Sequence, residues 1–142
     1  MLQVVERPRQ TVRLLGNHQV MVVAKTLQMA WDLAMRLDEN GYPPALVLFR
    51  KIASVDLSAS PPAVIVLTSE LTPENMATVY RFLRRSARFA KVPIIAVAPV
   101  GQGKVEFPVE FQIQGSSSTT DVLRHVIDLM QTIELGQGPK AA

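Results

Sequence analysis

The sequence predicts an α/β fold in which a doubly wound, five-stranded parallel sheet carries helices on both faces. Short runs rich in β-branched residues alternate along the chain with segments of helical periodicity, an alternation that is typical of parallel α/β folds. The runs are apolar almost throughout, as expected for strands that are buried on both sides. In chain order, the expected strands cover residues 20–24, 45–49, 63–67, 92–98 and 109–113.

Composition indicates one globular domain. The chain has 142 residues, of which 48% are hydrophobic, and this length suits a single core. It has no cysteine and only two histidines, which excludes disulfides and thiolate sites and argues against a histidine-based metal centre. No apolar run approaches the ~20 residues that cross a bilayer, and the first residues do not resemble a secretory signal. We therefore expect a cytoplasmic location without membrane contact.

The first helix is expected directly after residues 20–24. Thr26 suits its N-cap, and Gly41 suits the left-handed conformation at its end. The expected buried stripe consists of Leu27, Ala30, Trp31, Ala34 and Leu37. Residues 52–60 contain only three large aliphatic residues, so we expect a shortened second helix of two turns at most.

The third helix should begin at Thr72-Pro73-Glu74, where threonine caps, proline fits the first helical position and glutamate faces the positive end of the helix dipole. Its expected buried stripe consists of Met76, Val79, Tyr80, Leu83 and Ala87. The stretch 99–108 contains two glycines and two prolines and has no helical period, so the fourth helix is expected to be missing or reduced. The last helix should follow the hydroxyl-rich run 116–120.

The order and spacing of these elements resemble the flavodoxin-type fold and, more specifically, the receiver domains of response regulators. The resemblance covers residues 18–135; residues 1–17 are expected to be an N-terminal extension and 136–142 a disordered tail. It implies acidic Mg²⁺ ligands after the first strand, an aspartate phospho-acceptor after the third, a hydroxyl residue after the fourth and a lysine after the fifth. These positions fall on Ala24 and Lys25, Leu67 or Thr68, Ala98 and Gln114.

None of these residues supplies what the family's chemistry needs. Acyl-phosphate formation requires a carboxylate nucleophile and a hard cation held by oxygen ligands. The resemblance therefore implies a non-phosphorylatable pseudo-receiver, without enzyme activity or cofactor. Lys25 has two interpretations: its charge replaces the metal ion of the family, or its amine simply extends into solvent at the end of a strand.

Arginines follow one another at helical spacing in the third helix. Arg81, Arg84, Arg85 and Arg88 are three or four positions apart and should share one face of a continuous helix. This basic ridge is either a docking surface for an acidic protein, a contact for a phosphate backbone, or an ordinary solvated face near a helix C-terminus. We favour a protein over nucleic acid because we expect no aromatic ring for base stacking among the arginines.

A hydroxyl-rich run lies at the carboxyl end of the last expected strand, where open α/β sheets bind ligands. The candidate anion-binding residues are Ser116, Ser117, Ser118 and Thr119. Hydroxyls and free amides at a helix start suit a phosphate, but the same residues are also preferred N-caps. Both interpretations stay open.

The resemblance implies a phosphorylation-independent protein-interaction module of bacterial two-component signalling, and the arginines indicate an acidic protein partner if they bind it. Homo-oligomerisation stays open. The alternative is a protein that binds a small anionic ligand, phosphate or a nucleotide, at the carboxyl ends of the strands. A third interpretation is that the chain is one domain of a larger regulator.

Overall fold

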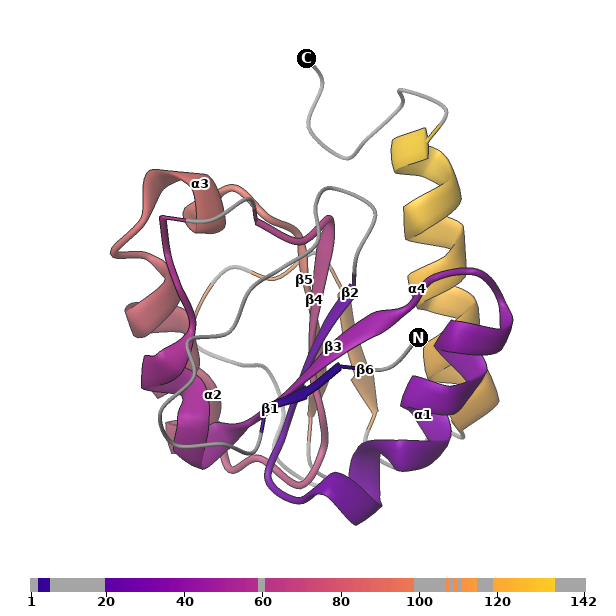
Figure 1. Cartoon of the computed structure of the whole chain (residues 1–142), viewed down its shortest axis with the longest axis horizontal. Coiled ribbons are helices and arrows are strands. Elements are labelled where there is room, and N and C mark those ends of the chain that lie inside the picture. The colour runs from indigo at the N-terminus through magenta and orange to yellow at the C-terminus, as the bar shows by residue number, and fades with distance from the viewer. Residues whose placement is uncertain are drawn as a thin grey trace.

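The computed structural model describes residues 3–5, 20–58, 61–98, 107, 109, 111–114 and 119–134. These residues form an α/β fold with an all-parallel sheet and helices on both faces (Figure 1). The predicted fold class is confirmed at this level. No helix in the described part of the chain is long and apolar enough to span a bilayer.

The sheet has one strand more than the sequence predicted. Its order is β1-β3-β2-β4-β5-β6, and five of these strands lie where strands were expected. The additional one, β1, pairs with β3 and falls within the segment that was assigned to an N-terminal extension. Three residues at a sheet edge are too few to give a periodic signal. The bounds are β1 Gln3–Val5, β2 Val20–Ala24, β3 Pro44–Leu48, β4 Val64–Leu67, β5 Ile94–Ala98 and β6 Phe111–Gln114.

Strands β2 to β5 are buried at every position. Successive side chains of a strand point to opposite faces of the sheet, so β2 contributes to two separate cores. Val20 and Val22 pack into the core under α1 and α4, whereas Met21 and Val23 pack into the core on the other face. This double burial explains why the strands are apolar throughout.

Helices α1 (Leu27–Glu39) and α4 (Thr119–Glu134) cover one face of the sheet (Figure 1). Gly41, at φ +85°, ends the turn after α1, as predicted. Trp31, however, is 43% exposed, so its prediction as a core residue is wrong. It lies about 100° around the helix from Ala30, and the buried face is centred on Ala30, Ala34 and Leu37.

The opposite face is covered by the 3-10 helix η1 (Phe49–Ser54) and by α2 (Pro73–Leu83) and α3 (Ala87–Ala90). Helix η1 has six residues and takes the place of the shortened second helix, although it starts before residue 52. The predicted reduction of the fourth helix concerns residues 99–108, of which only Phe107 is described. The predicted tail, residues 136–142, lies outside the described residues.

Helix α2 begins as predicted, because the Thr72 hydroxyl accepts a hydrogen bond from the Asn75 amide at 3.1 Å. It ends at Leu83 rather than continuing, and Ser86 caps the separate helix α3 through the Phe89 amide at 3.5 Å. Ala87, predicted to be buried, is exposed, and Phe89 is 1% exposed instead. Burying a phenylalanine stabilises a core far more than burying an alanine, so the break in the helix brings the larger side chain to the sheet.

Candidate functional site

The strand-end positions singled out by the resemblance lie at the carboxyl ends of the strands. Because β2, β4, β5 and β6 are parallel and adjacent, their carboxyl ends lie on the same side of the sheet. Val23 is paired with Leu67, and Ala98 with Gln114. Among the described residues, no group of three histidine or acidic side chains is placed to hold a metal ion.

Leu67, which the resemblance aligns with the phospho-acceptor of receivers, is part of the hydrophobic core. Its exposed fraction is 0%, and it belongs to the same core as Met76 and Val79 of α2. The end of β4 therefore presents a hydrocarbon side chain, facing inward, where acyl-phosphate chemistry would need an ionised carboxylate.

Thr68, the alternative position, uses its hydroxyl internally. The hydroxyl donates a hydrogen bond to the Val23 carbonyl at 3.0 Å, and the Thr68 amide donates to the same oxygen at 3.1 Å. Thr68 is only 8% exposed. It ties the end of β4 to β2, and its hydroxyl is not directed at solvent.

We expect Thr68→Val to destabilise the protein by about 0.5–1.5 kcal/mol, the net value of a hydrogen bond whose donor is removed. The shape is nearly kept, so no large cavity contributes. Urea denaturation measures the change. Thr68→Ser keeps the hydroxyl and separates its contribution from that of the methyl group; a valine variant as stable as the wild type would show that the Val23 contact contributes nothing.

Lys25 is exposed, and its backbone amide donates a hydrogen bond to the Glu70 carboxylate at 3.2 Å. The exposure fits the interpretation in which the amine extends into solvent. The contact with Glu70 was missed by the sequence analysis, because 45 positions separate the two residues and no local pattern links them. A carboxylate of the chain itself therefore takes a backbone donor at the end of β2 that an anionic ligand would otherwise use.

The proposed anion site at the start of α4 is only partly visible. Ser116, Ser117 and Ser118 lie outside the described residues, and Thr119 is the first residue of α4. The hypothesis of a phosphate site there stays a prediction.

The predicted arginine ridge does not lie on one continuous helix. Arg81 belongs to α2, Arg84 and Arg85 to the turn that follows, and Arg88 to α3 (Figure 1). The prediction of a single helical face is therefore wrong, since the chain breaks to bury Phe89. All four arginines are nevertheless exposed, as is Lys91. We call these five residues the basic surface.

Two of these arginines lie over aromatic rings. The Arg84 guanidinium is 5.3 Å from the centre of the Tyr80 ring, and that of Arg85 is 5.5 Å from the Phe82 ring. Tyr80 is in turn stacked on Phe107, with ring centres 4.7 Å apart. The expectation that no aromatic ring lies among the arginines is wrong.

The other two arginines have internal partners of a different kind. Arg81 donates to the Thr78 hydroxyl at 3.5 Å, and Arg88 donates to the Ser58 carbonyl at 3.4 Å. Both contacts are long and exposed, so they orient the side chains only weakly. Arg84 and Arg85 are therefore the arginines of the basic surface that aromatic contacts orient.

Charge is distributed unevenly along the chain. Between Glu74 and Glu106 there is no acidic residue but there are six basic ones, whereas the rest of the chain has nine basic and 12 acidic residues. Five of the six basic residues form the basic surface. The net positive charge of the chain is thus concentrated on α2, α3 and the turn between them.

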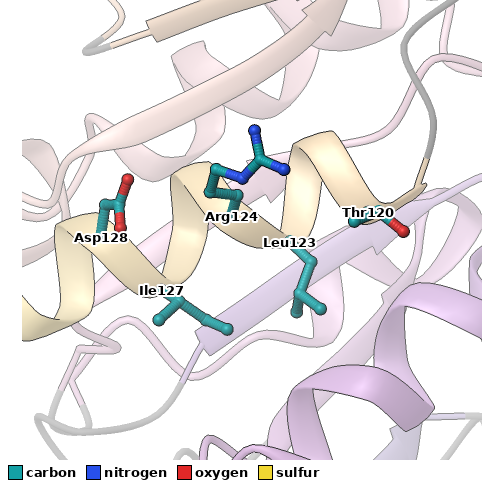
Figure 2. Close-up of a pocket in the computed structure, with 5 residues that line it drawn as sticks. All are labelled: Thr120, Leu123, Arg124, Ile127 and Asp128. Carbon is teal, nitrogen blue, oxygen red and sulfur yellow. The ribbon is translucent and has the colours of Figure 1, made fainter.

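A shallow hollow of about 200 Å³ lies on α4, on the other side of the sheet (Figure 2). Among its lining residues, Leu123 and Ile127 point to one side of the helix and Arg124 to the other (Figure 2). Arg124 forms an ion pair with Asp121 at 4.0 Å, so this face carries charges of both signs. His125 is exposed, so it lies off the buried face of the helix.

The chain matches no model of a known protein family, and no curated protein matches it significantly.

Proposed function

We propose that the chain is a receiver-like module of bacterial two-component signalling that binds another protein in the cytoplasm without being phosphorylated. The strand order supports the receiver-like part of this proposal. When β1 is set aside, the order β3-β2-β4-β5-β6 equals the 2-1-3-4-5 order of flavodoxin-like folds. The marginal β1 is then an addition at the edge next to β3.

The observation that carries the proposal is the state of the strand ends. Leu67 is completely buried, and the Thr68 hydroxyl is held by the Val23 carbonyl. Neither side chain is placed to receive a phosphoryl group, and neither is a carboxylate. A receiver-like fold without this chemistry would act through its surfaces, and the basic surface presents five exposed basic residues in a stretch of the chain without acidic ones.

The phosphorylation-independent part is tested by incubating the protein with acetyl phosphate and Mg²⁺ and measuring its mass. We expect no phosphoryl adduct, whereas a phosphorylatable receiver treated in parallel acquires one. An adduct on this chain would refute the proposal directly.

The interaction part is tested by affinity capture from lysate of the source organism, with and without acetyl phosphate. We expect the same specific protein in both samples, because no carboxylate stands at the described end of β4 to accept a phosphoryl group. Recovery of no specific protein at low salt would contradict an interaction module.

The alternative of a small anionic ligand at the strand ends is opposed by Glu70. Its carboxylate accepts from the Lys25 amide and adds negative charge where the ligand would bind. Thermal melting with phosphate, flavin mononucleotide and nucleotides decides the matter, since a ligand that binds the native state raises the melting temperature. We expect no increase with any of them.

A further inference from the structure

We propose that the basic surface binds an acidic segment of the partner protein, and that Arg84 and Arg85 are its oriented anchor pair. This inference rests on the proposed function as an interaction module and adds the surface and the chemistry of the partner. Three features of the surface support it: its charge, the orientation of the two guanidinium groups, and the contacts that the neighbouring aromatic rings make.

The charge asymmetry goes beyond what helix stability requires. A helix dipole favours basic residues in the last turn, which accounts for Arg81 at the end of α2. It does not account for the absence of every acidic residue between Glu74 and Glu106, or for Lys91 beyond α3. A surface with one sign of charge attracts partners of the opposite sign and accelerates their association.

The orientation of Arg84 and Arg85 favours bidentate binding of carboxylates. A guanidinium stacked on a ring keeps its N–H groups free at its edge, and these match the two oxygens of a carboxylate. The two residues are adjacent, both are exposed, and each lies over its own ring. Side chains that are already oriented lose less conformational entropy when a partner binds.

The aromatic rings favour a protein over nucleic acid. Binding of single-stranded nucleic acid relies on aromatic faces on which bases stack. Here the Tyr80 ring contacts both Arg84 and Phe107, and the Phe82 ring lies under Arg85. The rings therefore support the guanidinium groups, which suits the recognition of Glu and Asp side chains.

The test uses a fluorescein-labelled oligo-glutamate peptide as the probe, with binding followed by fluorescence anisotropy over a salt series. We expect the wild type to bind, and the Arg84→Glu/Arg85→Glu variant to bind at least about tenfold more weakly. The control is Arg36→Glu/Arg124→Glu, which changes the net charge equally but alters α1 and α4 on the other face. This control should bind within about twofold of the wild type, because charges beyond the Debye length of ~8 Å are screened.

A second pair of variants separates the effect of the orientation of Arg84 on peptide binding from the effect of its charge. Tyr80→Leu keeps every charge but removes the ring beneath Arg84, and we expect severalfold weaker binding with an unchanged salt dependence. Tyr80→Phe keeps the ring and should bind like the wild type. Thermal melting of both variants verifies that the fold is retained.

Four results of these binding measurements would overturn the inference. They are the absence of oligo-glutamate binding, equal weakening by the control reversal, wild-type binding by Tyr80→Leu, and tighter binding of an oligothymidylate of equal charge. The last result would assign the surface to nucleic acid. If the Arg84→Glu/Arg85→Glu variant still captures the cellular partner, this inference fails while the proposed function stands.

Discussion

Replacing Leu67 with aspartate should destabilise the protein by about 4 kcal/mol or more, the largest effect that we expect from a single substitution. The change removes a completely buried hydrocarbon side chain, which by itself costs about 2–5 kcal/mol in a packed core. It also introduces a carboxylate among Met76, Val79 and the other apolar residues of that core, and an unpaired buried charge adds to the loss. Urea denaturation followed by circular dichroism measures the change.

Two control variants separate the causes. Leu67→Met nearly conserves volume and should cost less than about 1.5 kcal/mol. Leu67→Asn has the shape of aspartate without its charge, and its stability should lie between those of the aspartate and methionine variants. An aspartate variant that is as stable as the methionine variant would contradict our description of this strand end.

Phe89→Ala should destabilise the protein by about 3–5 kcal/mol, the usual cost of removing a buried phenylalanine. Phe89 is among the largest fully buried side chains, and α3 itself has only four residues. A helix of this length has little stability of its own, so α3 depends on this contact with the core. Thermal or urea denaturation measures the loss.

The comparison with Ala87 makes this prediction specific to the break in the helix. Ala87→Ser changes an exposed residue of α3 and should alter stability by no more than about 0.5 kcal/mol. In a continuous helix, Ala87 would be buried and Phe89 would face solvent. A large loss of stability in Ala87→Ser together with a small loss in Phe89→Ala would therefore show that α2 and α3 form one helix.

The strand ends show how much of the candidate site was readable in advance. The absence of an aspartate and the presence of Leu67 and Thr68 at the relevant positions are properties of the sequence. That Leu67 faces the core and that the Thr68 hydroxyl bonds to Val23 depends on which face of β4 each side chain takes and on how β4 pairs with β2. The identities of the residues at these positions were therefore readable from the sequence, whereas their internal contacts were not.

For the basic surface too, the sequence reveals which residues are present, but not how they are arranged. The clustering of Arg81, Arg84, Arg85 and Arg88 is visible in the sequence, but their arrangement follows from the burial of Phe89. Arg84 lies over the Tyr80 ring, and this ring is stacked on Phe107, which is distant along the chain. Spacing along a helix predicts neighbours only where the helix continues, and here it ends at Leu83.

The sequence by itself determined the parallel α/β class, the positions of β2 to β5 and the start of α2 at Thr72, because each depends on residues within a few positions of one another. Only the tertiary structure decided the pairing of β1 with β3, the exposure of Trp31 and the contact between Lys25 and Glu70. These features depend on which surfaces the sheet covers and on segments that are far apart in the chain. Local patterns contain no information about such contacts, since the free energy of burial is shared by the whole core.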